Sequence, residues 1–214
     1  MFQYFNYNCI RITIRRIFSD KILIMKKIKN LLIIIFALTT LIISFFIDKQ
    51  INFLFGNLNN TFLDFMLSII TNFSFLLIVL YIIPTIFLIK NKKTNQFFYL
   101  WLTFFASFIV SFILKVMVAR PRPLNNTFIG FLSYSFPSMH TLTAFAALPL
   151  LDNKFPKLRI FWILVVFFIA VSRIYFNFHF LSDVVAGAII GYGIGLLLVN
   201  LEQKFNIYNK VYKK

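Results

Sequence analysis

Hydrophobic residues occupy long uninterrupted runs along the chain, and short polar segments separate them. The first run, residues 31–47, carries no charge and is bounded by Lys29 and Asp48. A helix of about 20 mainly apolar residues crosses a bilayer, so this run predicts a membrane span. Further runs that predict spans lie at residues 73–89, 97–114, 141–151, 160–171 and 184–201. The run at 141–151 is too short to cross alone and needs flanking residues.

Polar residues interrupt the apolar sequence from 62 to 89, which is too long for one untilted helix. Asp64, Thr71 and Asn72 are the interruptions. The pattern predicts a short interfacial helix at residues 61–70 before the second span begins. Pro84 predicts a kink within that span, because helices in lipid tolerate proline.

The composition supports a membrane protein, since 60% of residues are hydrophobic, against about 45–50% in soluble domains. We therefore expect an all-α integral membrane protein, a six-transmembrane-helix bundle in one domain at residues 31–201. A basic cytoplasmic segment (1–30) precedes it and a basic cytoplasmic tail (202–214) follows. Met25 opens a sequence typical of a bacterial start, so residues 1–24 are either a native amphipathic segment or an upstream-start artefact.

The net charge of +16 would suit a nucleic-acid partner, but the distribution of the charges argues against one. Lysine and arginine cluster in short loops between the apolar runs, as in cytoplasmic loops of membrane proteins. A cytoplasmic N-terminus places 17 of the 22 basic residues inside. We expect a multi-pass protein of the cell membrane with both termini cytoplasmic. The remaining cations and both histidines then fall outside, and the oligomeric state is not predicted.

Few side chains are available for metal or disulfide chemistry. Cys9 is the only cysteine, which rules out an intrachain disulfide. The acidic residues are Asp20, Asp48, Asp64, Asp152, Asp183 and Glu202. A two-metal hydrolase needs several carboxylate or imidazole ligands around its ions, and this chain scarcely supplies them. We therefore expect any hydrolytic chemistry to need neither a metal nor another cofactor.

Three polar segments between the later spans carry candidate chemistry. In the first, Lys115 and Arg122 stand two helical turns apart, but Pro121 and Pro123 predict that the helix ends before Arg122. These cations either bind an anion or extend towards lipid headgroups. Arg120, between them, is an additional cation for a diphosphate or an acidic headgroup, or a rim residue that faces lipid phosphates, and the second interpretation is favoured.

The second segment is SFPSMHT, residues 135–141. Ser138 is a plausible N-cap, and His140 would lie in the first turn of the helix that follows. Free backbone N–H groups at a helix N-terminus favour an anion there. The alternative is a structural histidine at an interface.

The third segment, SRIYFNFHFLSD, places Arg173 at the end of the fifth span. His179 and Asp183 are four residues apart, so on a helix they would share one face. The carboxylate would then receive the Nδ1 proton and leave Nε2 as a nucleophile or base. Such pairs are common, so this motif alone is weak evidence.

Together the segments indicate a phosphate site. Three cations, two histidines, an orienting aspartate and a helix-start serine fall on one predicted face of the membrane. Phosphoryl transfer depends mainly on positioning and on stabilising the charge of the phosphoryl oxygens. One histidine can attack phosphorus while the other protonates the leaving oxygen.

The segments resemble the type 2 phosphatidic acid phosphatase family, which also includes vanadium haloperoxidases and glucose-6-phosphatase. The family pattern is Lys-x6-Arg-Pro, then Pro-Ser-Gly-His, then Ser-Arg-x5-His-x3-Asp. The matching residues are Lys115, Arg122-Pro123, Pro137-Ser138-Met139-His140, Ser172-Arg173, His179 and Asp183. Every spacing within the motifs agrees, and the resemblance extends over about residues 64–201.

The resemblance implies a six-helix bundle with a metal-independent, extracytoplasmic active site. By this resemblance His179 forms a phosphohistidine, Asp183 orients it, and His140 is the general acid and later the base. Phosphate binding would fall to Lys115, Arg122, Ser138, Met139 and Arg173. Met139 replaces the glycine of the family, and glycine lets a backbone N–H approach the phosphate closely. The replacement leaves the extent of activity open.

The leading hypothesis is a bacterial lipid phosphate phosphatase that acts on a membrane lipid. The chain is similar to phosphatidylglycerophosphatase B-type and undecaprenyl-diphosphate phosphatase-type members. The substrate would be phosphatidylglycerophosphate, undecaprenyl diphosphate or phosphatidic acid. Two alternatives stay open: a lipid phosphotransferase or lipid A phosphatase of the same family, and a non-catalytic binder or transporter of lipid phosphate.

Overall fold

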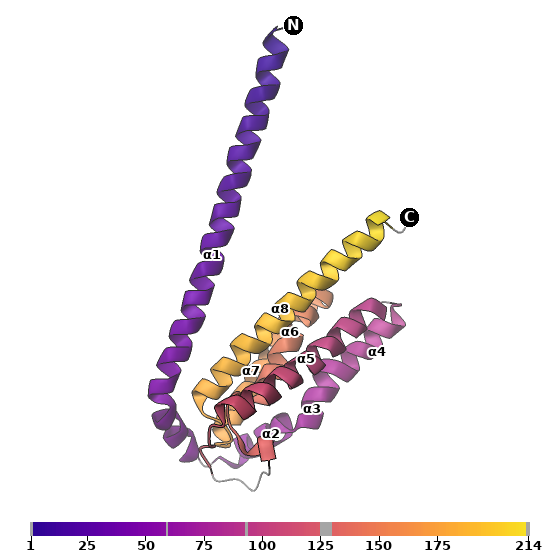
Figure 1. Ribbon diagram of the computed structural model, residues 1–214. Coiled ribbons are helices and arrows are strands. Elements are labelled where there is room, and N and C mark those ends of the chain that lie inside the picture. Colours follow the sequence, from indigo (N-terminus) through magenta and orange to yellow (C-terminus); the bar gives the residue numbers. More distant parts are fainter. Residues whose placement is uncertain (1, 59, 93, 125–129, 213–214) are drawn as a thin grey trace. The chain divides into compact units, whose positions relative to one another are not determined.

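Every regular element in the described part of the chain is helical (Figure 1). The computed structural model describes residues 2–58, 60–92, 94–124 and 130–212. The prediction of an all-α membrane protein is therefore confirmed. The chain forms two compact units, Met1–Ile42 and Ile43–Lys214.

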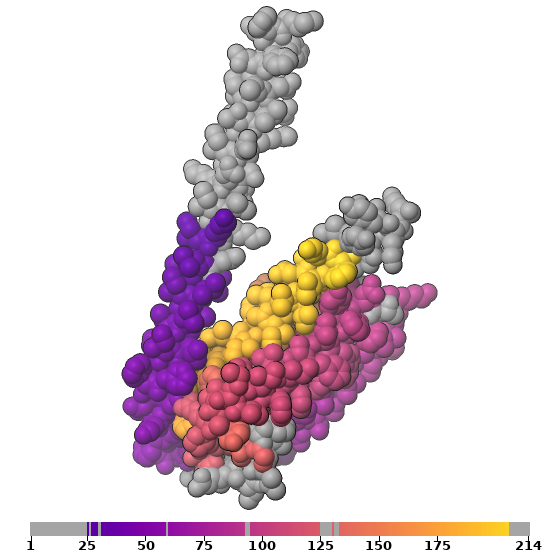
Figure 2. Space-filling model, viewed as in Figure 1, coloured from indigo at the N-terminus to yellow at the C-terminus, as the bar shows by residue number. Residues whose placement is uncertain are grey.

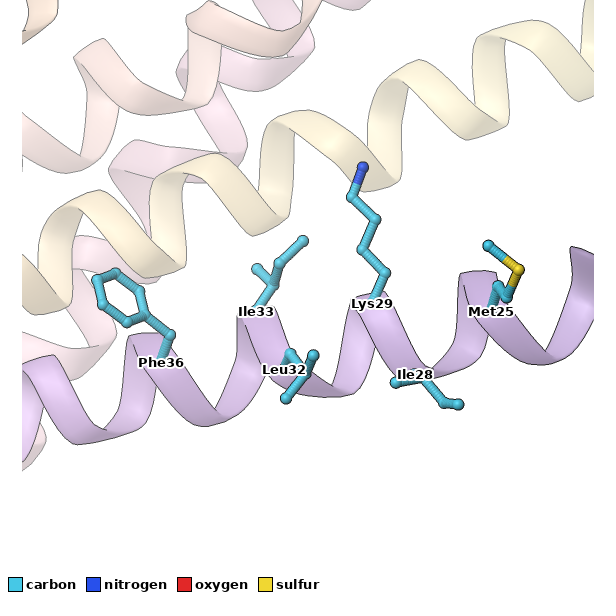
Figure 3. A pocket seen from close by; sticks show the side chains of 6 residues that line it. All are labelled: Met25, Ile28, Lys29, Leu32, Ile33 and Phe36. Atoms are coloured by element: carbon cyan, nitrogen blue, oxygen red, sulfur yellow. The ribbon is translucent and has the colours of Figure 1, made fainter.

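The first unit is the N-terminal part of helix α1 (Phe2–Gly56). Five apolar side chains and Lys29 line a shallow hollow along this helix (Figure 3). The apolar side chains that line the hollow are more than half exposed, and Phe36 is the most exposed at 73%. No charged residue occurs between positions 31 and 47, so lipid is the solvent that suits this surface. The side chains of residues 1–24 lie outside the described part, as does most of the predicted basic segment.

The second unit contains the other helices and the last part of α1. The α-helices are α2 (Thr61–Thr71), α3 (Phe73–Leu77), α4 (Ile83–Lys90), α5 (Thr94–Val118), α6 (Met139–Lys154), α7 (Arg159–Tyr175) and α8 (Leu181–Tyr212). A π-helical turn (Ile78–Ile82) and 3-10 turns (Gly130–Ser133 and Pro156–Leu158) connect them. Helix α6 packs against α5, α7 and α8 and is buried along most of its length.

In the part of the chain that the structure describes, five segments are long and apolar enough to cross a membrane, by length and composition. They are Lys27–Gly56, Phe73–Lys90, Asn95–Val118, Pro156–Tyr175 and Leu181–Phe205. Helices α4 and α5 lie on the surface seen in Figure 2, and both expose large apolar side chains. Helix α6 has 16 residues and is not among the five, so a sixth span stays a prediction.

The π-helical turn accounts for Pro84 in the second predicted span. Proline has no N–H to donate, and its ring crowds the carbonyl group four residues earlier, here that of Leu80. The wider π turn at Ile78–Ile82 precedes Pro84 and includes Leu80. The sequence predicted a kink at this position, and the structure accommodates the proline with this local change of helix type.

The bundle extends beyond the predicted end of the domain at residue 201. Glu202 is fully buried, and Lys154 of α6 donates to its Oε1 atom at 2.6 Å. Burial of two charges is favourable only when they are paired, so this contact fastens α8 to the end of α6.

Helices α6 and α8 approach so closely that their contact requires glycine. A methyl group on Gly191 would overlap the carbonyl group of Leu142, and one on Gly195 would overlap that of Ala146. We expect Gly191→Ala to destabilise the protein by about 2 kcal/mol or more, because backbone atoms cannot move aside. A lower thermal unfolding temperature in detergent would show this effect.

Gly193 provides the matched control for this prediction. It lies on the same helix, and a methyl group there would have no neighbour within 4 Å. Gly193→Ala should leave the unfolding temperature unchanged or raise it, since alanine favours a helix by about 1 kcal/mol. Equal effects of the two substitutions would contradict the close approach of α6 and α8.

Candidate active site

The three predicted segments meet at one end of the bundle, where α5 and α7 end and α6 and α8 begin (Figure 1). Two backbone hydrogen bonds join them. The N–H of Ser138 donates to the carbonyl oxygen of Asp183 at 3.0 Å, and that of Ser135 donates to the carbonyl oxygen of Arg120 at 2.8 Å. The sequence expectation that distant segments form one site therefore agrees with the backbone contacts.

The first segment supplies two cations from different backbone environments. Lys115 is on α5 and is almost completely buried, with Nζ donating to the carbonyl oxygen of Tyr134 at 2.5 Å. Helix α5 ends at Val118, as the prolines predicted, so Arg122 lies beyond the helix. One guanidinium nitrogen of Arg122 donates to the carbonyl oxygen of Phe178 at 2.8 Å. This bond holds Arg122 against the third segment.

The second segment begins α6. Ser138 occupies the predicted N-cap position, but its hydroxyl makes no capping bond and instead accepts from Thr141 Oγ1 at 3.1 Å. Met139, where the family has glycine, is the first residue of the helix and is half-buried. His140 lies in the first turn, and its ring meets Phe73 edge to face with centroids 5.2 Å apart. The first N–H groups of α6 therefore lie beside this imidazole.

The third segment begins with Arg173 in the last turn of α7, and this side chain is buried. It donates to both the hydroxyl (2.6 Å) and the carbonyl oxygen (3.2 Å) of Thr71, the last residue of α2. Its guanidinium also lies over the ring of Phe178, 4.7 Å from the centroid. Thr71 is a partner that the sequence did not reveal.

His179 and Asp183 do not share a helical face, and this expectation was wrong. Helix α8 begins at Leu181, so His179 lies in the segment before it. The two side chains are nevertheless close, with Nδ1 of His179 3.7 Å from Oδ2 of Asp183. That distance is longer than a hydrogen bond. The backbone N–H of Phe180 donates to the same Oδ2 atom at 2.9 Å, which turns the segment towards the aspartate.

The contacts of His179 indicate its tautomer. A guanidinium nitrogen of Arg122 lies 3.4 Å from Nε2, and arginine can only donate. Nε2 therefore presents a lone pair, and the proton belongs on Nδ1, which faces Asp183. Burial, together with the cations Arg173, Arg122 and Lys115, holds the pKa of His179 well below its usual range. The imidazole is neutral at neutral pH.

The rim position expected for Arg120 was also wrong. Its guanidinium forms ion pairs with Asp48 (2.8 Å) and Asp183 (2.7 Å). Asp48 belongs to α1, which continues through residue 48 to Gly56. One turn later, Asn52 donates to the carbonyl oxygen of His179 at 3.3 Å. The spacing of Asp48 and Asn52, four residues apart at the end of an apolar run, was the available sequence signal.

The chemistry of the site suits an anion. Lys115, Arg122 and Arg173 surround the imidazole of His179, and Arg122 and Arg173 can bind phosphate oxygens with two nitrogens each. Among the described residues, no group of three or more His, Cys, Asp or Glu side chains is arranged to hold a metal ion. The arrangement places an unprotonated Nε2 among three cations.

Comparison with known proteins identifies the family. The family model of the PAP2 superfamily matches residues 96–207, just over half of the chain. A PAP2-type phosphatidylglycerolphosphate phosphatase from Bacillus subtilis has a similar structure, with a TM-score of 0.65, 23% identity, and coverage of 78% of this chain and 94% of that one.

LpxE from Aquifex aeolicus is a second similar structure, with a TM-score of 0.60 and 26% identity over 72% of this chain and 95% of that one. No curated protein sequence matches the chain. The PAP2 match includes all three segments of the site. The chain therefore belongs to the PAP2 superfamily and has the fold of its membrane lipid phosphatases.

Proposed function

We propose that the protein is a phosphatase that removes phosphate from a membrane lipid through a covalent intermediate on His179. The observation that carries the proposal is the unprotonated Nε2 of a buried imidazole among three cations. Nε2 attacks phosphorus, and the bond from phosphorus to the leaving oxygen breaks. His140 donates a proton to that oxygen and later takes one from the water that hydrolyses the phosphohistidine.

Binding of the phosphoryl group falls to the cations and to the start of α6. Lys115, Arg122 and Arg173 stabilise negative charge on the equatorial oxygens, where phosphoryl transfer requires it. Ser138 and the N–H of Met139 add donors at a helix N-terminus. A methionine there retains the N–H and needs only ordinary helical backbone angles, so the replacement of glycine is compatible with activity.

The substrate class follows from the surroundings of the site. The site lies at an end of helices whose outer faces are apolar, so a lipid can present its headgroup while its chains stay in the bilayer. The B. subtilis neighbour is a phosphatidylglycerolphosphate phosphatase, which makes this lipid the first candidate. Undecaprenyl diphosphate and phosphatidic acid offer the same chemistry with a different headgroup.

The test is phosphate release by the purified protein from these three lipids in mixed micelles, with and without EDTA. We expect release from at least one lipid, and we expect EDTA to leave the rate unchanged because the proposed groups are all side chains of this protein. Binding of lipid phosphate without any release would overturn the proposal in favour of a non-catalytic binder. Labelled phosphate that appears on an added acceptor lipid would identify a transferase.

The depressed pKa of His179 predicts the pH dependence of the rate. Protonation of Nε2 removes the attacking lone pair, so kcat/KM should fall with decreasing pH, with its midpoint below the ordinary histidine value of 6.5. Because the pKa of His179 is lower in the native state than in the unfolded chain, the unfolded chain takes up this proton first as the pH falls below about 6.5. The free energy of unfolding should therefore also decrease as the pH is lowered through this range. The second ionisation of the phosphate ester, measured by titrating the substrate alone, is subtracted from the pH profile. An acid limb above pH 6.5 would contradict the proposal.

A further inference from the structure

Arg120 lies between two buried carboxylates from distant parts of the chain. One guanidinium nitrogen is 2.8 Å from Oδ2 of Asp48, and the other is 2.7 Å from Oδ1 of Asp183. Ser182 completes the cluster, because its N–H and hydroxyl donate to Asp48 at 2.8 and 2.5 Å, and its hydroxyl accepts from Arg120 at 2.7 Å. The ring of Phe180 covers the guanidinium, 4.1 Å from centroid to carbon. Asp48, Arg120 and Ser182 are called the clamp below.

The clamp fixes the plane of the Asp183 carboxylate. Oδ1 is held by Arg120 and Oδ2 by the N–H of Phe180, so both oxygens have assigned partners. This arrangement leaves Oδ2 as the oxygen that faces Nδ1 of His179. If Arg120 released Oδ1, the carboxylate could rotate away from the imidazole.

Asp48 adds a charge effect to this geometry. An Arg120 guanidinium that paired with Asp183 alone would neutralise the charge that has to stabilise the imidazole. Asp48 is buried and shares the same guanidinium, so two negative charges face one positive charge. The excess negative charge lies beside His179, where it offsets the cations that would bind phosphate.

We propose that Asp48 and Arg120 are positioning residues, which hold the Asp183 carboxylate towards Nδ1 of His179 and leave one net negative charge beside the imidazole. The inference rests on the proposed function, because it assigns the clamp to the support of the attacking imidazole. The clamp acts through Asp183, which lies between it and His179. It therefore should affect the rate of the chemical step and leave phosphate binding unaltered.

The first test is Arg120→Lys, which keeps the charge but replaces a planar fork by a single ammonium group. That group cannot span both carboxylates in the same way. We expect kcat to fall about tenfold or more, the size typical of losing a group that orients a reactive imidazole. KM and the inhibition constant of inorganic phosphate should stay unchanged. A variant with full kcat, or one that loses only phosphate binding, would overturn the proposal.

The second test uses the acid limb of kcat/KM, which a purely structural role would not move in a directed way. The charged and titratable groups around His179 are Lys115, Arg122, His140, Arg173 and Asp183. Against that background, Asp48→Asn removes a negative charge and should shift the limb to lower pH. Arg120→Gln removes a positive charge but keeps an N–H donor for Oδ1 of Asp183, so it should shift the limb to higher pH. The proposal would be overturned if the acid limbs of the two variants stayed at the wild-type pH or moved in the same direction.

An ion pair at the other end of the bundle supplies the control. Asp152 on α6 and Arg159 on α7 lie 3.4 Å apart, and the arginine is mostly exposed. Asp152→Asn and Arg159→Gln make the same charge changes and should alter neither kcat nor the acid limb. Thermal unfolding identifies any variant that fails to fold, and such a variant is left out of the comparison. Asp48→Glu, which keeps the charge, is measured beside Asp48→Asn. Its acid limb should stay at the wild-type pH, and a limb displaced as far as that of Asp48→Asn would overturn the proposal.

The outcomes separate this inference from the proposed function. A wild-type protein that releases no phosphate from any lipid overturns the proposed function, and the clamp with it. An active wild-type protein with an inactive His179→Ala variant and fully active clamp variants overturns the clamp alone.

Discussion

Replacing His179 by alanine is expected to abolish phosphate release, with a fall in kcat of at least about 10⁴-fold. The substitution removes the Nε2 lone pair and leaves the cations that bind phosphate in place. Lys115, Arg122 and Arg173 contact backbone carbonyl groups or Thr71, so their positions do not depend on the imidazole alone. KM and inhibition by inorganic phosphate should therefore change much less than kcat. Initial rates on the most active lipid measure this separation.

Trapping the intermediate strengthens the test of His179. Labelled lipid phosphate, quenched in alkali, should leave an alkali-stable, acid-labile label on the wild-type protein. The His179→Ala variant should carry no label, and the surface variant Asp152→Asn should be labelled as strongly as the wild type. A His179→Ala variant that still turns over, or a label on another residue, would contradict a nucleophilic role for His179.

Much of the fold could be predicted because an apolar composition identifies most of the spans. A helix that crosses lipid satisfies its own backbone hydrogen bonds, and its side chains must be apolar over about 20 residues. Such runs are visible in the sequence without knowledge of the packing. Helix α6 is the exception, because protein surrounds it and its sequence contains threonine, alanine and proline among the leucines. Burial within a bundle leaves no comparable pattern in the sequence.

The site residues could be located because they stand in short motifs, but their contacts could not. The partner of Arg120 in α1 is 72 positions away, and Thr71 is 102 positions from Arg173. Such pairings depend on how helices pack, which local spacing does not encode. The expectation that His179 and Asp183 share a helical face failed for a related reason, although their side chains lie 3.7 Å apart. Four residues of separation predict a shared face only within a helix, and α8 begins after His179.

Replacing His140 by alanine should have a different kinetic signature from the loss of His179. A general acid contributes about 10²–10⁴-fold when the leaving oxygen is a poor leaving group, as the alkoxide of a lipid is. We expect a loss of this size on the lipid substrate. On 4-nitrophenyl phosphate the leaving group departs without a proton, so the first step should remain fast. The variant should then release one equivalent of nitrophenolate in a burst and turn over slowly, because water attack still needs the missing base.

The burst separates the two histidines, since the His179→Ala variant should show none. His140 lies in the first turn of α6 with its ring against Phe73, and Arg173, Arg122 and Lys115 act on it as they act on His179. Stopped-flow absorbance at equal protein concentrations measures the burst amplitude. A folded His140→Ala variant that retains full activity on the lipid, or that shows no burst with the aryl ester, would contradict its assignment as the acid. Loss of the burst would instead place His140 in the formation of the phosphoenzyme itself.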